Sequence, residues 1–251
     1  MSISARERPS KLKAPVSEIF FSYQGEGVYA GEPQIFVRFA GCNLKCDYCD
    51  TTKTQRVSKS ASKQVSVGQV TEKIKQLSRS NRRLTTYDLP LTVSITGGEP
   101  LLYPEYLLEL LPELKKHRFK VYLETNGTLP EAFLRVKKYV DVVAMDIKLP
   151  SSCKRVLWKA HREFLVLSEK KAFVKVIVTG KTTKSEFNKA IEIVCSVSKS
   201  IPFVIQPVTV LKSEKGECFK PLQMLDWLRA AKRKLKDVSI IPQLHKIWGI
   251  R

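Results

Sequence analysis

Short apolar runs rich in β-branched residues alternate with helix-like segments through most of this chain, and this rhythm is the strongest constraint on its fold. From Leu91 onward the runs read LTVSIT, FKVYLET, VDVVAMDI, AFVKVIV, PFVIQPV and a weaker VSII, and an earlier run reads QIFVRFAG. Such runs, separated by amphipathic helices, are typical of βα units with a parallel sheet. About six units are too few for a closed eight-stranded barrel. The sequence therefore predicts an α/β fold, an open partial (β/α)6-type barrel of parallel strands.

The segments between the runs carry helix signals. Thr183 and Glu186 stand at capping-box spacing before an apolar face. Further helices are predicted near Val70–Leu77 and from about Pro221 to Lys236.

Length and charge bound the domain organisation. The 251 residues carry 44 Lys and Arg against 24 Asp and Glu, a formal net charge of +20. We expect a disordered basic arm at 1–14 and one domain at 15–251 with a basic insert at about 53–90. The chain has no apolar run near the roughly 18 residues needed to cross a bilayer and no secretory core, so we expect a cytoplasmic protein. The basic surplus indicates either a polyanionic partner or an ordinary solvated surface.

Three of the six cysteines are bunched in the loop GCNLKCDYCDT, which follows the first strand-like run. Cys42, Cys46 and Cys49 have C-x-x-x-C-x-x-C spacing, and the other cysteines are isolated. Thiolates are the usual ligands of iron–sulfur clusters, and three of them on a 4Fe–4S cubane leave one iron open. The amino and carboxylate groups of S-adenosylmethionine (SAM) would fill that position, with Tyr48 against its adenine. The alternative is a structural zinc site, which usually takes a fourth Cys or His ligand.

Two polar motifs follow later strand-like runs, at the ends where parallel sheets collect their chemistry. These motifs are TGGEP (96–100) and ETNG (124–127), the second of which is otherwise an ordinary Asn-Gly turn. Together with the cysteine spacing, these motifs in this order resemble the radical SAM superfamily. The resemblance implies that the TGGEP glycines let the backbone approach the SAM methionyl group and that Glu99 accepts from its ammonium. It also implies hydrogen bonds from ETNG to the SAM ribose and carboxylate.

Longer stretches narrow the resemblance to one family. EIFFSYQGEGVYAGEPQIFVRFAGCNLKCDYCDT and the C-terminal PQLHKIWGIR, with MDIKLPSS and IQPVT between them, resemble 7-carboxy-7-deazaguanine synthases. The resemblance implies a lyase that converts 6-carboxy-5,6,7,8-tetrahydropterin to 7-carboxy-7-deazaguanine and ammonia, in deazapurine biosynthesis of the queuosine and archaeosine type. It implies that the reduced cluster cleaves SAM to a 5′-deoxyadenosyl radical, that SAM is regenerated, and that magnesium assists. It also implies a homodimer and no catalytic residue beyond the cluster and SAM.

Individual residues take roles from the same resemblance. Arg38 lies in an apolar strand, where an unpaired charge is costly, and a contact with the substrate carboxylate would offset that cost. Its alternative is an ion pair with Glu26 or Glu32. Gln24 offers a donor and an acceptor to a pterin edge, or is a satisfied loop glutamine. The implied substrate residues are Tyr23, Gln24, Gly25, Arg38, Thr96 and Arg251; the magnesium ligand is Thr51; the SAM residues are Tyr48, Cys49, Asp50, Gly98, Glu99, Asp146, Ile147, Lys148, Gln206, Pro207, Val208 and Thr209.

Two other functions stay open on the sequence alone. A glycyl-radical enzyme activase shares the cysteine loop and the glycine-rich motif, but would not need Q-G-E-G or Arg38. A basic nucleic-acid binder with a metal knuckle would explain the charge but not the motifs at successive strand ends. For the favoured function an external electron is needed, and we expect an acidic flavodoxin or a ferredoxin-type carrier to dock on the basic stretch Lys53–Arg83.

Overall fold

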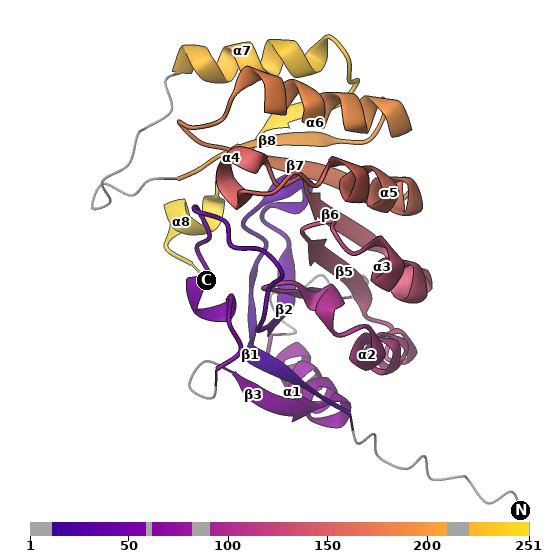
Figure 1. Ribbon diagram of the computed structural model, residues 1–251. Coiled ribbons are helices and arrows are strands. Elements are labelled where there is room, and N and C mark those ends of the chain that lie inside the picture. The colour runs from indigo at the N-terminus through magenta and orange to yellow at the C-terminus, as the bar shows by residue number, and fades with distance from the viewer. Residues whose placement is uncertain (1–11, 59–61, 82–90, 210–220, 251) are drawn as a thin grey trace, which may run out of the picture.

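Nine strands form one sheet in the computed structural model, which describes residues 12–58, 62–81, 91–209 and 221–250 (Figure 1). The strand order is β3-β1-β2-β4-β5-β6-β7-β8-β9. β2 and the strands from β4 to β9 run parallel, while β1 is antiparallel to both β2 and β3. Since β3 and β9 stand at the two ends of this order, the sheet does not close. The predicted open partial barrel of parallel strands is confirmed.

The elements follow the predicted rhythm, and each strand-like run of the sequence is a strand of the parallel part. The strands are β1 Lys13–Tyr23, β2 Pro33–Phe39, β3 Lys63–Ser66, β4 Thr92–Gly97, β5 Lys120–Thr125, β6 Val142–Asp146, β7 Ala172–Val178, β8 Phe203–Pro207 and β9 Val238–Ile240. The α-helices are α1 Val67–Ser80, α2 Pro104–Lys116, α3 Pro130–Val136, α4 Pro150–Cys153, α5 Trp158–Ser168, α6 Lys184–Val197, α7 Pro221–Lys232 and α8 Leu244–Trp248, and the short 3-10 helices are η1 Gly27–Tyr29, η2 Thr52–Thr54, η4 Pro100–Leu102 and η5 Lys137–Tyr139.

Helices cover the outer face of the curved sheet. In Figure 1, α2, α3, α5 and α6 follow one another along this face, and α8 lies on the opposite side. The main hydrophobic core lies between these helices and the strands, and its members include the fully buried Leu107, Phe164 and Phe187. The predicted capping box fixes the start of α6, because Glu186 N donates to Thr183 Oγ1 at 3.3 Å and Thr183 N donates to Glu186 Oε1 at 2.7 Å.

The inner face of the sheet changes from apolar to polar along the strands. Near the amino ends, the ring of Tyr29 in η1 packs on Tyr122 and Phe173, with centroid distances of 5.6 and 6.0 Å. Alternate side chains of a strand share a face. The next inward positions are polar on four strands: Glu124 after Tyr122, Asp146 after Ala144, Lys175 after Phe173 and Gln206 after Val204. The amino half of the interior is therefore filled, and chemistry is left to the carboxyl half.

The described part of the predicted basic insert belongs to the sheet and its cover. β3 pairs with β1, and α1 contains the predicted helix near Val70–Leu77. Residues 59–61 and 82–90 of this segment lie outside the described residues, as do residues 1–11 of the predicted arm, and β1 begins at Lys13. Among the described residues, no helix is long and apolar enough to cross a membrane.

The packing of η1 under the cavity makes a testable prediction at Gly27. This glycine has φ +68°, and a Cβ there would overlap the Phe173 ring. Gly27→Ala is expected to lower the free energy of unfolding by about 1–3 kcal/mol more than Gly31→Ala, because overpacking adds to the strain of a positive φ. Gly31 is the matched control, since its φ is +92° but nothing lies within 4 Å of its Cβ position. Urea unfolding of the cluster-free proteins measures the difference, and equal losses would show that η1 does not pack as described.

Candidate functional site

One cavity of about 570 Å³ lies at the carboxyl ends of the parallel strands, between the cysteine loop and α8. Most of the sequence-predicted residues line it: Tyr23, Gln24, Gly25, Arg38, Cys42, Cys46, Tyr48, Cys49, Asp50, Thr51, Thr96, Gly98, Asp146 and Lys148. The predicted residues Glu99, Ile147, Gln206, Pro207, Val208 and Thr209 do not line its wall, and Arg251 lies outside the described residues. The structure thus brings together residues from nearly the whole length of the chain.

The cysteine loop is held against two other segments by its backbone. Cys42 N donates to Gln55 O at 3.1 Å, and Asp47 N donates to Ser152 O at 3.1 Å. Burial raises the pKa of the Cys42 and Cys46 thiols, that of Cys46 to about 11. Lys148 opposes this shift only in part, and a metal cluster bound beside the thiols would favour their thiolate form.

The three cysteines are suited to hold a cluster. All three line the same cavity. Thiolates are the usual ligands of iron–sulfur clusters, and on a cubane each of the three would bind a different iron. A single structural zinc ion would usually take a fourth Cys or His ligand.

The glycines of TGGEP serve the cysteine loop before any ligand. A Cβ on Gly97 would overlap the Phe39 backbone, and one on Gly98 would overlap the carbonyl of Gly41. This close approach lets Gly98 N donate to Phe39 O at 3.0 Å and lets Glu99 N donate to Gly41 O at 2.8 Å. The sequence analysis explained these glycines by a close approach to SAM. The structure gives a further reason inside the protein, because the two backbones pack so closely that a Cβ has no room.

Glu99 lies behind the cavity wall with its carboxylate already engaged. It is fully buried and accepts from Leu101 N at 3.1 Å, Asn126 N at 2.8 Å and the Thr125 hydroxyl at 3.0 Å. Burial raises its pKa to about 7 against the effect of these donors. The geometry therefore disfavours the predicted contact with the SAM ammonium. Glu99 instead fixes the ETNG turn to the TGGEP turn.

A buried ion network that the sequence analysis missed centres on Lys175. Its side chain is 4% exposed, forms an ion pair with Glu26, and lies 3.4 Å from Asp146. Asp146 also pairs with Lys148 at 2.8 Å, and Lys148 lies 5.4 Å from the centre of the Tyr48 ring. Burial opposes the charge of both lysines, but the nearby carboxylates outweigh it, and the net effect raises the pKa of Lys175 and Lys148. The sequence did contain a signal for this network, a lysine inside the apolar run AFVKVIV. As with Arg38, an unpaired charge in an apolar strand is costly, so a charged partner is expected.

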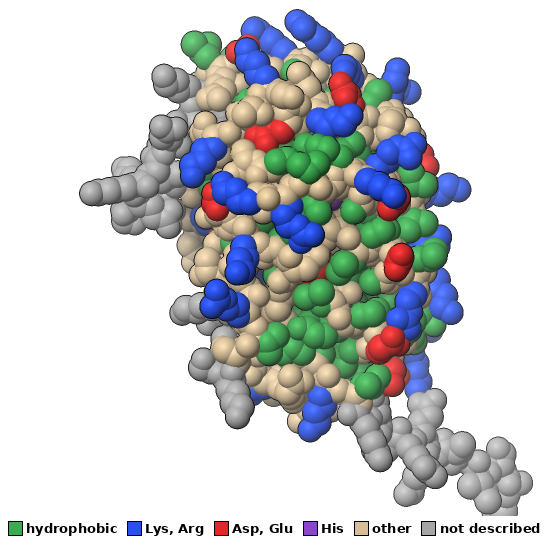
Figure 2. Space-filling model, viewed as in Figure 1, with side chains coloured by type: hydrophobic (Ala, Val, Ile, Leu, Met, Phe, Trp, Pro, Cys, Tyr) green, Lys and Arg blue, Asp and Glu red, His purple; other side chains and the backbone are tan. Residues whose placement is uncertain are grey.

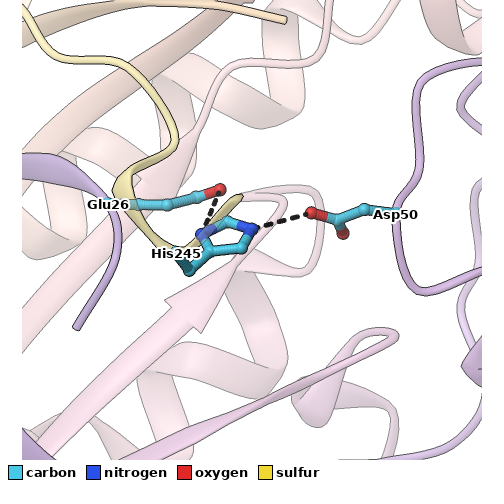
Figure 3. Close-up of side chains that lie close together, drawn as sticks. All are labelled: Glu26, Asp50 and His245. Carbon is cyan, nitrogen blue, oxygen red and sulfur yellow. Dashed lines mark ion pairs between the residues drawn. The ribbon is translucent and has the colours of Figure 1, made fainter. Parts of the chain in front are cut away.

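Glu26, Asp50 and His245 line the cavity and lie close to one another (Figure 3). His245 lies 3.4 Å from Asp50 and 4.0 Å from Glu26, and Gln243 Nε2 donates to both carboxylates at 3.1 and 3.2 Å. Burial lowers the pKa of His245, but its hydrogen bond to Asp50 and the two negative charges outweigh this and raise it overall. A Cβ on Gly25 would overlap the His245 side chain. The Q-G-E-G loop and α8 therefore form one wall.

The predicted substrate residues Gln24 and Arg38 both have protein partners. The Gln24 amide donates to Glu124 at 2.9 Å, and its oxygen accepts from Glu26 N at 3.1 Å. This favours the alternative of a satisfied glutamine, one that orients Glu124 in the cavity. Arg38 pairs with Glu18 at 2.7 Å, its opposite residue on β1, and not with the predicted Glu26 or Glu32.

Gln206 is buried without a partner for its side chain. It is fully buried, and neither its amide nitrogen nor its oxygen has a hydrogen-bond partner among the described residues. An unpaired buried amide costs about 1–3 kcal/mol. Because Gln206 does not line the cavity wall, its contact with SAM stays a prediction.

His161 joins two of the turns around the cavity from behind. Its Nε2 lies 3.1 Å from the Asn126 carbonyl oxygen and 3.5 Å from Lys148 N. Burial lowers its pKa to about 4. The neutral ring thus fixes the ETNG turn relative to the loop after β6.

Acid should unfold the protein partly through His161. Because its pKa is lower in the folded state than in the unfolded chain, its contribution is complete well above pH 6.5 and is lost as the pH falls toward 4. Between pH 7 and pH 5 the wild type is expected to lose about 2 kcal/mol more unfolding free energy than His161→Gln, which retains an amide donor for Asn126. Urea titrations of the cluster-free proteins at both pH values test this, and parallel losses would contradict it.

Comparisons with known proteins agree with this geometry. Residues 36–165 match the radical SAM superfamily. The 7-carboxy-7-deazaguanine synthase of Geobacter sulfurreducens is 39% identical over 96% of this chain and 99% of its own length, and that of Archaeoglobus fulgidus is 36% identical over 96% and 100%.

Solved structures share the fold. QueE from Escherichia coli superposes with a TM-score of 0.57 at 22% identity, covering 91% of this chain and 93% of QueE. A radical SAM methyltransferase from Sphaerobacter thermophilus gives 0.62 at 11% identity, covering 89% and 77%. The glycyl-radical activase is not favoured by these relatives. This chain belongs to the 7-carboxy-7-deazaguanine synthase family of radical SAM enzymes, which carry a 4Fe–4S cluster and use SAM.

Proposed function

We propose that this enzyme converts 6-carboxy-5,6,7,8-tetrahydropterin to 7-carboxy-7-deazaguanine and ammonia. One observation carries the proposal: a single cavity joins the three cysteines to a wall that carries both an arginine and carboxylates. A cluster and SAM at one end supply the radical that starts the reaction, and the polar wall at the other end suits a small heterocycle with a carboxylate. The fold places the arginine close to the cysteines. Arg38 lies in β2, and the cysteine loop directly follows this strand.

At the SAM end, the chain's own residues are proposed to bind and orient. Lys148, held by Asp146, offers a buried cation to a carboxylate, and Tyr48 beneath it offers a ring face to an adenine. Gln206 offers an amide with free donor and acceptor atoms. The remaining proposed SAM residues are Cys49, Asp50, Gly98, Ile147, Pro207, Val208 and Thr209.

At the substrate end, Arg38 is proposed to bind the pterin carboxylate. Its ion pair with Glu18 engages Nη1, and the guanidinium has further donors for a second carboxylate. Thr96 and Gln24 both hold Glu124, at 2.7 and 2.9 Å, so that its carboxylate faces the cavity. Tyr23, Gly25 and the terminal Arg251 complete the proposed set.

Thr51 is proposed as a magnesium ligand. Thr51 lines the cavity, and its hydroxyl lies 3.6 Å from the Cys49 sulfur. A hydroxyl is a hard oxygen donor of the kind that magnesium accepts, with water and the substrate carboxylate completing the octahedron. We also propose a single catalytic domain over 15–251, which the one continuous sheet supports and extends to the start of β1 at Lys13. The family resemblance supports a homodimer.

The substrate assignment is tested at Arg38. Arg38→Lys keeps a charge for Glu18 but loses the paired donors, so kcat/KM for carboxytetrahydropterin is expected to fall roughly tenfold to hundredfold. The assay uses reconstituted enzyme, SAM and dithionite under anaerobic conditions and follows the ultraviolet absorption of the deazapurine. Arg135→Lys is the matched control, since Arg135 makes a paired contact with Glu105 at the surface and should leave kcat/KM unchanged. Wild-type enzyme that forms no deazapurine would refute the proposed reaction, and an unaffected Arg38→Lys would refute the role of Arg38.

An acidic flavodoxin-type carrier is proposed as the reductant, docking on cations around the cysteine loop. Figure 2 shows Lys and Arg spread over the visible face, with no single stripe. Beside the cysteine loop, however, the exposed Lys45, Lys154, Arg155 and Lys181 come together, with Lys154 and Lys181 at 3.1 and 3.8 Å from Asp47. Arg155 donates to Asn43 O at 3.3 Å, which ties this loop-side cationic patch to the cluster ligands. The described part of Lys53–Arg83 is mostly β3 and α1 at one edge of the sheet.

Charge reversal distinguishes the two surfaces. The triple variant Lys45→Glu, Lys154→Glu, Lys181→Glu is expected to lower kcat/KM for reduced flavodoxin at least tenfold at low salt and to leave dithionite-driven turnover unchanged. The control reverses Lys73, Lys75 and Arg79 on α1 and should leave both rates unchanged. If only the α1 variant lost turnover with flavodoxin, the docking site would be the stretch Lys53–Arg83 predicted from the sequence. If the patch variant lost as much turnover with dithionite as with flavodoxin, docking at the patch would be contradicted.

A further inference from the structure

The sulfur of Cys42 lies next to a side-chain amide from a distant part of the chain. Asn126 Nδ2 is 3.9 Å from Cys42 Sγ, although the two residues are 84 positions apart. The backbone N–H of Leu44 also points at this sulfur, at 3.5 Å. Sulfur is a weak acceptor as a thiol, but a cluster-bound thiolate carries negative charge and accepts more strongly. The amide of Asn126 is thus in place to donate to a cluster ligand.

The direction of the Asn126 amide is fixed by its neighbours. Thr128 N donates to Asn126 Oδ1 at 3.1 Å, and the Thr128 hydroxyl donates to the same oxygen. Asn43 Nδ2 in turn donates to Thr128 Oγ1 at 2.8 Å, which leaves Asn43 Oδ1 to accept from Asn126 Nδ2 at 2.8 Å. If the Asn126 amide were flipped in this closed ring, its oxygen would lie against another acceptor, Asn43 Oδ1. The amide hydrogens therefore point at Asn43 and Cys42.

The backbone of Asn126 is fixed as well. Its N–H donates to the buried Glu99 carboxylate at 2.8 Å, and its carbonyl oxygen lies 3.1 Å from His161 Nε2. Both partners are fully buried. A donor held on both sides loses little conformational freedom when it meets the sulfur, so the hydrogen bond is preorganised.

We propose that Asn126 is a positioning residue that raises the reduction potential of the cluster through its hydrogen bond to Cys42. The reduced cluster carries one more negative charge than the oxidised one. A hydrogen bond to a ligating sulfur therefore stabilises the reduced form more, and such bonds are among the features that set cluster potentials. Asn126 would thereby ease electron uptake from a weakly reducing carrier. The inference depends on the binding of a cluster to these cysteines, and it does not depend on the pterin being the substrate.

The test is the midpoint potential of the reconstituted cluster, without SAM or pterin, in a titration followed by electron paramagnetic resonance. Asn126→Ala is expected to shift the potential to more negative values, by about a tenfold change in the ratio of oxidised to reduced cluster at a fixed potential, or 59 mV for one electron. Asn43→Ala is the matched control. Both variants break the Asn43–Asn126 hydrogen bond, but only Asn126→Ala removes the donor from Cys42, so Asn43→Ala is expected to keep the wild-type potential.

Iron and sulfide analysis accompanies each titration. If Asn126→Ala does not take up a full cluster, Asn126→Ser replaces it, because its hydroxyl still accepts from Thr128 but stops short of Cys42; the same negative shift is expected. An unchanged potential in the loaded Asn126 variant, or an equal shift in Asn43→Ala, would overturn the proposal. Since no substrate is present, failure of the deazapurine assay would leave this result standing.

Discussion

The cavity depends on the ion pairs of the buried Lys175 ammonium. It lies between Glu26 of the Q-G-E-G loop and Asp146 at the end of β6. A buried charge is costly unless it is paired, and removal of one partner leaves the other uncompensated. Each partner then reaches a further part of the wall: Glu26 is bonded to Gln243 before α8, and Asp146 holds Lys148 over Tyr48. One cation on β7 thus connects the part of the wall at Glu26 and Gln243 with the part at Asp146 and Lys148.

The cluster end is built by backbone contacts between neighbouring turns. The TGGEP turn after β4 is bonded directly to the cysteine loop, and this approach is closed to any residue with a Cβ at Gly97 or Gly98. Glu99 of the same turn holds Asn126 of the next, and Asn126 returns to the cysteine loop through Asn43 and Cys42. The TGGEP turn, the ETNG turn and the cysteine loop are therefore one connected structure, so a shift in one would move the others.

The other end of the cavity is formed by the Q-G-E-G loop and α8. The N–H of Leu244 in α8 donates to Gly25 O at 2.9 Å, and His245 fills the space beside Gly25. This contact brings the C-terminal segment onto the Q-G-E-G loop. It joins two stretches that narrowed the resemblance, Q-G-E-G and the C-terminal PQLHKIWGIR. An activase would not need this loop, and the family relatives do not favour that function.

The sequence by itself determined the parallel strands, the capped helix α6 and the family, because these depend on local periodicity, fixed spacing and short motifs. It also placed most of the cavity residues, since the carboxyl ends of parallel strands meet at one edge. The tertiary structure alone decided how these residues pair. Arg38 meets Glu18 through strand register, Gln24 is held by Glu124, and Glu99 turns away from the cavity to hold the ETNG turn. Lys175 and His245 joined the site only when distant segments packed together. Which residues pair across such distances depends on which polar side chains are buried next to one another. No local sequence pattern contains this information.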